Sequence, residues 1–357
     1  MNTAAVGSSS ASPTSAPARL SVTILSDTPG LVEAATSALK DLPVDLVHLP
    51  SADWLADPHS PSHASALSTR VLLADPGLVV GRLDLFPNLA WMHSTWTGVD
   101  MMMPPTRTDY ALTRLSELGA PMAEFVIACV LSRERHFASL AEQQRTCTWT
   151  KLHYRHFPNI SVGVMGITGR IGSCVARALR YMGCHVVGLA SKSRDSFNFD
   201  GDGVSPPSHT IRGTPFGTAK VFSTAHVADF LSSQLDYIVA ILPSTAETRG
   251  LLSGDALRSA SASRPVLINT GRGDLLSESD VIKALDEKWI SHAVLDVFEE
   301  EPLPIKSALW KREDVTVTPH NSAISYADAV VACFRENVGR FVGGEELMYK
   351  VDFEKGY

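Results

Sequence analysis

Cysteine is scarce in this sequence, and the few thiols show no pairing pattern. The 357 residues include five cysteines, at positions 129, 147, 174, 184 and 333, and no two of them form a C-x-x-C pair. An odd count without such spacing argues against a disulfide framework and against a zinc knuckle. We therefore expect reduced, buried thiols in a cytoplasmic protein.

Long apolar runs, an excess of positive charge and clustered metal ligands are also missing. The best apolar run, residues 125–131, is far shorter than the roughly 18 residues of a membrane-spanning helix, so no membrane partner is expected. The net charge of −7 argues against a nucleic-acid partner. The histidine pairs 59/63 and 153/156 have no carboxylate or cysteine at ligand spacing, so no metal site is predicted.

Apolar residues make up 45% of the chain, and they follow the pattern of alternating strands and helices. Val175, Leu179 and Met182 share one face of a helix, and residues 31–42 show similar spacing. Short apolar runs predict buried strands at 22–25, 71–74, 161–165, 185–189, 237–242, 266–268, 293–297 and 315–317. This alternation predicts an α/β fold of parallel sheets, and the length predicts about two domains.

Three further segments have a composition of their own. Residues 1–19 are rich in Ser, Ala and Pro, which predicts a disordered tail and not a secretory signal. Residues 120–148 lack glycine and have no proline after Pro121, which favours one long helix that could connect two domains. Residues 195–217 are rich in Gly, Pro and Ser, which indicates a long surface loop.

A glycine-rich turn separates the predicted strand 161–165 from the helix around Val175. Glycines let a backbone approach a phosphate, and the helix N-terminus supplies free N–H groups and the positive end of its dipole. The spacing is G-x-x-G-x-x-G, one residue longer near Thr168 than the dinucleotide fingerprint G-x-G-x-x-G. The residues predicted to bind a dinucleotide pyrophosphate are Gly166, Thr168, Gly169, Arg170, Ile171 and Gly172.

The next predicted strand ends in a basic, hydroxyl-rich turn formed by Ser191, Lys192, Ser193 and Arg194. Sites that prefer NAD place an acid here to accept the ribose hydroxyls, but no acid precedes Asp195. Two cations and two hydroxyls would bind a 2′-phosphate well. The turn therefore predicts NADPH, with NADH as the second cofactor to consider; a merely solvated basic turn is the alternative.

Four strings of polar residues lie at or after the ends of predicted strands, at 242–250, 268–274, 295–304 and 318–323. In an open parallel sheet the carboxyl ends of the strands line the ligand crevice. Arg272, Asp296, Glu301 and His320 all fall at or just beyond such ends. They can therefore converge although they are far apart in the sequence.

Together the four strings resemble the D-isomer-specific 2-hydroxyacid dehydrogenase family. The chain is most similar to its glyoxylate/hydroxypyruvate reductase branch, because of residues 111–115, residues 122–125 and the basic turn. The resemblance implies that Arg272 binds the substrate and that Glu301 and His320 form the acid/base pair. It also implies that Asp296 holds the nicotinamide carboxamide.

The resemblance implies further binding residues. Those around the ribose and nicotinamide are Leu242, Pro243, Thr248, Thr270, Gly271 and Ser322. The loop whose backbone N–H groups bind the substrate carboxylate in the family corresponds to Thr95, Trp96, Thr97 and Gly98. The family often has glycine in place of Trp96, whose indole could shape the pocket or pack at the domain seam.

The fold implied by the resemblance consists of two Rossmann-like or flavodoxin-like parallel-sheet domains with a cleft between them. The substrate domain would span residues 20–120, with residues 322–357 returning to it, and the dinucleotide-binding domain residues 121–321. A homodimer formed through the long helix is implied as well.

The three candidate catalytic side chains suit the reduction of a 2-keto acid independently of the resemblance. Hydride arriving at the carbonyl carbon builds negative charge on the oxygen, to which a histidinium such as His320 can deliver a proton. Glu301 would hold the ring and favour its charged form. Arg272 would meet the substrate carboxylate with two parallel bonds. We predict an NADPH-preferring reductase that converts a small 2-keto acid, such as glyoxylate or hydroxypyruvate, to the D-2-hydroxy acid.

Two alternatives stay open. One is an NAD-linked D-2-hydroxyacid dehydrogenase for a larger substrate. The other is a non-enzymatic, dinucleotide-sensing protein similar to transcriptional corepressors, which can keep the same triad. The absence of a nuclear-type basic cluster argues against this second alternative.

Overall fold

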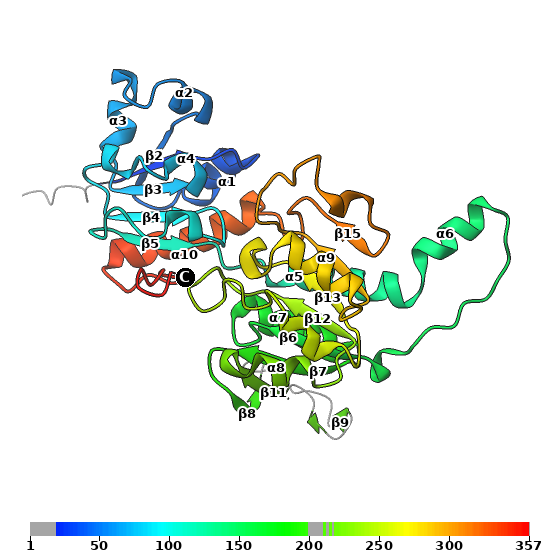
Figure 1. The fold of residues 1–357 in the computed structure, drawn as a ribbon. Coiled ribbons are helices and arrows are strands. Elements are labelled where there is room, and N and C mark those ends of the chain that lie inside the picture. The colour runs from blue at the N-terminus through cyan, green and yellow to red at the C-terminus, as the bar shows by residue number, and fades with distance from the viewer. Residues whose placement is uncertain (1–18, 199–209, 212–213, 216–217, 357) are drawn as a thin grey trace, which may run out of the picture.

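Two lobes, each built on a sheet of parallel strands, make up the protein (Figure 1). The computed structural model describes residues 19–198, 210–211, 214–215 and 218–356. The predicted disordered tail, residues 1–19, lies outside the described residues apart from Arg19, whose guanidinium pairs with Asp45 at 2.6 Å.

The first sheet has the strand order β2-β1-β3-β4-β5, and all its pairings are parallel. Its strands are β1 (Leu20–Leu25), β2 (Val44–His48), β3 (Val71–Ala74), β4 (Trp91–Ser94) and β5 (Ala111–Arg114). Its connecting helices are α1 (Leu31–Ala38), α2 (Ser51–Ala56), α3 (Ala64–Leu67) and α4 (Pro76–Val79). This is the flavodoxin-like order of a doubly wound sheet.

The second sheet has the order β15-β14-β13-β12-β6-β7-β11-β8, and only β8 is antiparallel to its neighbour. Its strands are β6 (Ser161–Met165), β7 (His185–Ala190), β8 (Arg194–Asn198), β11 (Thr218–Ser223), β12 (Tyr237–Ala240), β13 (Val266–Asn269), β14 (His292–Leu295) and β15 (Val315–Val317). Its helices are α5 (Gly119–Glu134), α6 (Phe137–Arg145), α7 (Arg170–Tyr181), α8 (Val227–Leu231) and α9 (Glu278–Asp286). A separate pair is β9 (Thr210–Ile211) with β10 (Thr214–Pro215). The strand order reverses between β6 and β12, the point at which such sheets bind ligands.

The chain returns to the first lobe at its C-terminal end. Helix α10 (Ala327–Gly343) packs against α1, and the ring of Phe334 stacks on that of Trp91 with centroids 5.0 Å apart. Lys350 then forms a bridge to Thr113 of β5. In Figure 1 this red helix lies among the blue and cyan elements of the first sheet.

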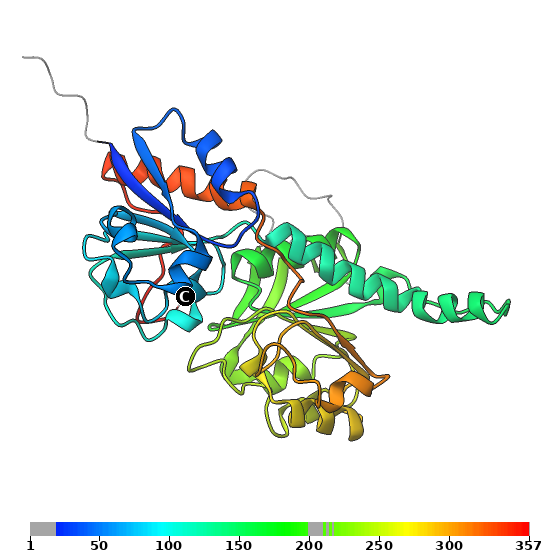
Figure 2. The same ribbon diagram turned by 90° about the horizontal axis from the view of Figure 1, so that it is seen from above.

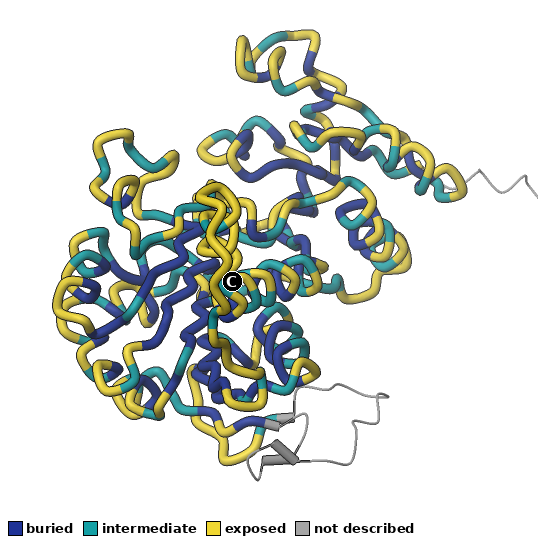
Figure 3. Tube along the Cα trace, turned by 90° about the vertical axis from the view of Figure 1, so that its right-hand side faces the viewer, coloured by how far each residue is buried: buried dark blue, intermediate teal, exposed yellow. Residues whose placement is uncertain are grey.

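The predicted α/β fold of parallel sheets is confirmed. Central strands such as β3 and β6 are buried along their whole length (Figure 3), because helices cover both faces of a parallel sheet. All eight predicted strands form, with ends shifted by a few residues at most. The strands that the sequence does not predict are β2, β4, β5, β8, β9, β10 and β11. Polar residues, such as Asp45 in β2 and Lys220 in β11, interrupt the apolar pattern there.

The prediction of one helix over residues 120–148 is wrong. Helix α5 ends at Glu134, and α6 begins at Phe137. Between them His136 has a left-handed backbone (φ 57°), which cannot continue a helix, and its ring nitrogen Nε2 lies 2.7 Å from the carbonyl oxygen of His153. Helix α5 packs against α7, whereas α6 projects away from both lobes (Figure 2).

The prediction of a long loop over residues 195–217 also needs correction at its start. Strand β8 occupies Arg194–Asn198 and pairs with β11, so that the chain folds back onto the sheet. Residues 199–209, 212–213 and 216–217 of this segment lie outside the described residues. In the part of the chain that the structure describes, no helix is both long and apolar enough to cross a membrane.

Candidate active site

His320 and Glu301 form a hydrogen-bonded pair at the edge of the second sheet. His320 follows β15 and Glu301 lies in the loop after β14, and their Nδ1 and Oε2 atoms are 2.7 Å apart. The other oxygen of Glu301 accepts a hydrogen bond from the backbone N–H of Phe298 at 2.9 Å. Because Glu301 holds Nδ1, the Nε2 atom of the ring is left for another group.

The hydrogen bond between His320 and Glu301 shifts the pKa of each group in the direction that favours its charged form. The hydrogen bond to Glu301 raises the pKa of His320, although burial and the charge of Arg272 oppose the shift. Burial opposes ionisation of Glu301, but hydrogen bonds from His320 and Phe298 outweigh it and lower the pKa of the carboxyl group. The side chain of His320 is 53% exposed, so the charged imidazole is accessible.

Asp296 holds the loop that carries His320. This aspartate follows β14 and is fully buried. One oxygen accepts from the Thr318 hydroxyl at 2.6 Å and the Asn321 N–H at 3.0 Å, and the other from the Ser322 N–H at 2.9 Å. Sequence reasoning did not find this positioning contact, because a strand-end aspartate gives no sign of which loop it will bind.

Arg272 lies in the loop after β13, at the carboxyl-end edge of the second sheet, and contacts the first lobe. Its Nε donates to Asp100 at 2.7 Å and its Nη1 donates to the carbonyl of Gly271 at 2.7 Å. A Cβ on Gly98 would lie 1.5 Å from Nη2, so the guanidinium lies directly against the loop of residues 95–98. Its charge lowers the pKa values of both His320 and Glu301, as expected of a cation near that pair.

Asp100 is a site residue that sequence reasoning missed. It follows the predicted substrate loop by two positions and pairs with Arg272 across the lobes. The sequence does contain a signal for Asp100, because an acid two residues after Gly98 can reach the same ligand or side chain that the loop contacts. Its partner could not be predicted, because the sequence does not show which cation of the other domain lies opposite.

The predicted substrate loop connects β4 to the region of Arg272. Thr95 is buried, and its hydroxyl donates to Asp75. The indole of Trp96 is 38% exposed and lies beside Gly77 of α4, and its two expected roles, shaping the pocket or packing at the domain seam, remain predictions. Thr97 and Gly98 then lead the chain past the Arg272 guanidinium.

The glycine turn between β6 and α7 is shaped to expose its backbone. Gly166 has a left-handed φ of 92°, and a Cβ on Gly172 would lie 2.1 Å from the carbonyl oxygen of Gly166. Gly169 precedes α7 with no side chain capping the helix, so its first N–H groups stay available. Thr168, Gly169 and Arg170 are exposed, whereas Ile171 is half-buried. The turn therefore fits a pyrophosphate.

The other predicted cofactor residues lie along the same edge. Ser191, Lys192, Ser193 and Arg194 are all exposed just after β7, and the Arg194 guanidinium lies 5.2 Å from the ring centroid of Phe197. A Cβ on Gly271 would lie 2.9 Å from backbone atoms of Leu242, so these two chain segments touch. The hydroxyl of Thr248 closes the turn after β12 by donating to the carbonyl of Pro243, while Thr270 and Ser322 are buried.

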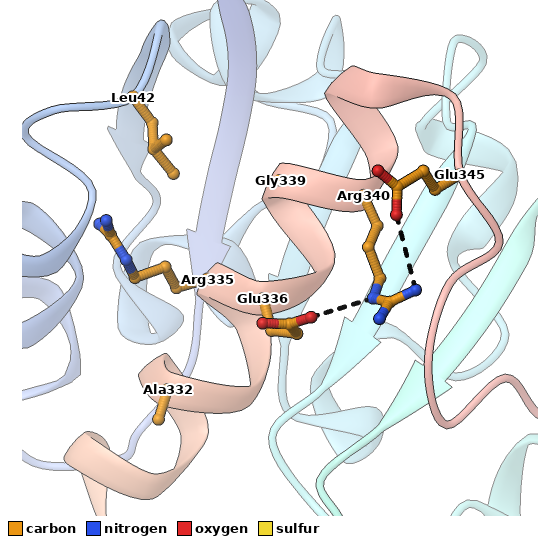
Figure 4. Close-up of a pocket in the computed structure, with 7 residues that line it drawn as sticks. All are labelled: Leu42, Ala332, Arg335, Glu336, Gly339, Arg340 and Glu345. Atoms are coloured by element: carbon orange, nitrogen blue, oxygen red, sulfur yellow. Dashed lines mark hydrogen bonds and ion pairs between the residues drawn. The ribbon is translucent and has the colours of Figure 1, made fainter.

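Two further observations concern possible binding sites in the rest of the described structure. The described ranges contain no group of three or more His, Cys, Asp or Glu side chains arranged to hold a metal. A hollow of about 360 Å³ beside α10 lies on the first lobe (Figure 4), but its charges are already paired. Arg340 contacts Glu336 and Glu345, and Arg335 contacts Asp41.

Residues 127–322 match the family described as D-isomer specific 2-hydroxyacid dehydrogenase, NAD binding domain. The chain belongs to this family. It is therefore an NAD(P)-dependent oxidoreductase whose second lobe carries the dinucleotide-binding fold, and the resemblance inferred from the four strings is confirmed.

Solved structures of this dehydrogenase family share the whole architecture. An NADPH-dependent glyoxylate/hydroxypyruvate reductase from Sinorhizobium meliloti, in complex with NADP and sulfate, is 27% identical, with a TM-score of 0.75 over 95% of this chain and 100% of that chain. A probable 2-hydroxyacid dehydrogenase from Rhizobium etli, with NADP, HEPES and tartaric acid, is 27% identical, with a TM-score of 0.74 over 95% and 99%. A family member from Xanthobacter autotrophicus, with NADPH and MES, is 28% identical, with a TM-score of 0.75 over 94% and 100%.

Replacing Gly172 with alanine tests the glycine turn. The new Cβ must push the Gly166 carbonyl away, so we expect the dissociation constant of NADPH to rise roughly 10- to 100-fold, as measured by nicotinamide fluorescence. Gly339→Ala is the matched control, because nothing lies within 4 Å of a Cβ at that helical position. Unchanged NADPH affinity in Gly172→Ala would remove the turn from the cofactor site.

Proposed function

We propose that this dehydrogenase is an NADPH-preferring reductase that converts a small 2-keto acid, such as glyoxylate or hydroxypyruvate, to the D-2-hydroxy acid. The observation that carries the proposal is the His320–Glu301 pair, with a raised histidine pKa, in one region with the Arg272 guanidinium. The similarity to the Sinorhizobium meliloti glyoxylate/hydroxypyruvate reductase supports the same substrate class.

In this proposal NADPH, when bound, supplies the hydride. The glycine turn of residues 166–172 would hold its pyrophosphate and the basic turn of residues 191–194 its 2′-phosphate. No acid that would favour a bare ribose hydroxyl lies in this turn before Asp195. The remaining residues around the ribose and nicotinamide would be Leu242, Pro243, Thr248, Thr270, Gly271, Asp296 and Ser322.

The substrate carboxylate would bind between the lobes. Arg272 offers its Nη2 group, which lies against Gly98. The loop of residues 95–98 would add backbone N–H groups, although those of Thr95 and Trp96 already donate to the Ala74 carbonyl and the Ser94 hydroxyl. Since Asp100 already occupies Nε, the carboxylate would compete with Asp100 for this cation. In this arrangement the 2-keto group would lie within reach of His320.

His320 would supply the proton. Its Nε2 atom would donate to the carbonyl oxygen of the substrate as negative charge develops there, and such proton transfer accelerates a reaction about 100- to 10,000-fold. Glu301 keeps the ring charged and fixes its orientation through Nδ1. In the reverse direction the neutral ring would accept the hydroxyl proton of the 2-hydroxy acid.

In this proposal the substrate domain comprises residues 20–120 with 322–357, and the dinucleotide-binding domain comprises residues 121–321. The packing of α10 on α1 supports the return of the C-terminal segment to the first lobe.

Initial rates over a panel of 2-keto acids, with NADPH and NADH, test the proposed function directly. We expect turnover of glyoxylate or hydroxypyruvate, with a higher kcat/KM for NADPH than for NADH. His320→Ala should lower kcat by at least about 100-fold with NADPH affinity retained, because only the proton donor is removed. His59→Ala, at an exposed position, is the control. Full activity of His320→Ala would exclude the proposed mechanism.

Glu301→Gln tests the pH dependence. Reduction requires charged His320, so the rate is retained below the pKa of His320 and lost as pH rises through it. Glutamine removes the largest cause of the raised pKa, so the loss should begin at lower pH, and kcat at pH 8 should fall about 10- to 100-fold. Glu300→Gln is the neighbouring control. Superimposable pH profiles of wild type and Glu301→Gln would contradict the assigned role.

Helix α6 and the residues that follow it as far as Trp149, here called the projecting arm, support a homodimer. None of the residues of α6 is buried, and Phe137, Leu140 and Trp149 are 56%, 41% and 96% exposed. Apolar side chains left uncovered on a projecting segment favour a second copy as their cover.

We expect sedimentation to give twice the mass of one chain. Leu140→Asp should shift the protein towards monomer, since it buries a charge in the proposed interface. Leu55→Asp is the matched control, because Leu55 is 53% exposed on α2, away from the arm. A monomeric wild type would contradict this part of the proposal.

A further inference from the structure

Arg114, the last residue of β5, lies beside the predicted substrate loop. It is paired in register with Ser94, from which that loop departs. Its Nη1 donates to the carbonyl of Thr97 at 3.3 Å. The first lobe thus directs a guanidinium of its own to the loop that Arg272 approaches from the second lobe.

The charge of Arg114 lacks the compensation that comparable arginines have. Arg107, Arg155 and Arg312 are each paired with a carboxylate, at 2.6, 2.5 and 2.8 Å. In the described part of the chain no carboxylate lies within ion-pair distance of Arg114, which is only half-exposed. Burial, and after it the charges of Arg272 and Arg170, lower the pKa of Arg114. A partly buried guanidinium beside like charges is costly, and an anion would offset that cost.

A second unsatisfied group lies next to it. The hydroxyl oxygen of Thr97 is buried and has no hydrogen-bond partner within the described residues. Buried hydroxyls are usually paired, so one without a partner indicates a missing acceptor or donor. Thr97 and Gly98 are joined by one peptide bond. Nη1 of Arg114 donates to its carbonyl oxygen, the unpaired hydroxyl belongs to Thr97, and Nη2 of Arg272 lies against Gly98. Three donor groups therefore lie around this one peptide bond.

Arg272 can share a bound carboxylate with a second donor group. Its Nε and Nη1 atoms are already bonded to Asp100 and to the Gly271 carbonyl. A guanidinium has five N–H donors, so Nη2 and the second N–H of Nη1 remain for a carboxylate while Nε stays with Asp100. Because a carboxylate can accept about four hydrogen bonds, two bonds from Arg272 leave capacity for a second donor group.

We propose that Arg114 is a second substrate-binding guanidinium, which holds the carboxylate of the 2-keto acid together with Arg272 and the Thr97 hydroxyl. This inference rests on the proposed function and adds a binding residue from the first lobe. The carboxylate then contacts both cations and offsets one of the two positive charges that Arg114 and Arg272 carry. Binding of an acid consequently links the two lobes.

The test measures an unreactive acid and turnover separately. Oxamate, a carboxylate the size of a small 2-keto acid, is titrated by calorimetry into the NADPH-loaded protein. Arg114→Gln should raise the oxamate Kd and the KM of the 2-keto acid about 10- to 100-fold, as expected for a lost bond to a charged group, with unchanged NADPH affinity. Arg114→Lys should recover part of the loss, since it keeps the charge without the planar fork.

Two variants keep the result interpretable. Arg82→Gln is the matched control, because Arg82 also makes one long bond to a carbonyl, that of Leu78 at 3.4 Å. Thr97→Ala removes only the hydroxyl and should raise the oxamate Kd about 2- to 10-fold, even if Arg114→Gln does not fold.

Each outcome decides between defined alternatives. Unchanged oxamate affinity in folded Arg114→Gln overturns the inference. If Arg114→Gln does not fold, unchanged oxamate affinity in both Arg114→Lys and Thr97→Ala overturns it. A wild type that binds no oxamate overturns it as well. Weakened NADPH binding with intact oxamate binding would assign Arg114 to the cofactor phosphates near Arg170 and also overturn it. Oxamate binding that depends on Arg114, without turnover of any 2-keto acid, supports this site and refutes the proposed function.

Discussion

A single buried carboxylate holds the loop on which the candidate chemistry depends. Both oxygens of Asp296 accept hydrogen bonds, from the hydroxyl of Thr318 and from the backbone N–H groups of Asn321 and Ser322. The backbone N–H of His320 donates to the Asp296 carbonyl, and His320 itself has a left-handed φ of 51°. A buried charge without partners is costly, so the carboxylate and the loop stabilise each other. The direction of the imidazole is therefore set from the end of β14.

The parallel sheet explains why residues distant in sequence lie at the same edge as this carboxylate. Strands β13, β14 and β15 are in register at their carboxyl ends, where Asn269 pairs with Leu295 and Leu295 with Val317. The loops that follow these three strands therefore begin at the same edge of the sheet. Arg272 comes from the first of these loops, Glu301 from the second and His320 from the third. Their convergence is a consequence of topology and needs no local sequence proximity.

The sequence was informative where local physics decides the structure. Apolar runs buried on both faces predicted the central strands, and the glycine turn was placed correctly between β6 and α7 because its neighbours have clear strand and helix patterns. It was uninformative where a contact between distant segments decides. The break at His136 coincides with a contact to His153, and Asp100 matters because Arg272 lies opposite. Neither partner can be read from the residues around the position itself.

Charged contacts between the lobes are weaker than the apolar packing within them. Arg272 and Asp100 are 27% and 36% exposed, and Arg170 and Glu117 are 61% and 50% exposed. Pairs of this kind contribute about 0–1 kcal/mol each. Loss of one such pair therefore costs little free energy, and an added carboxylate between Arg272 and Arg114 would offset the repulsion of their charges. An acid bound by Arg272 of the second lobe and Arg114 of the first would add a contact between the lobes, so its binding would be coupled to their relative position.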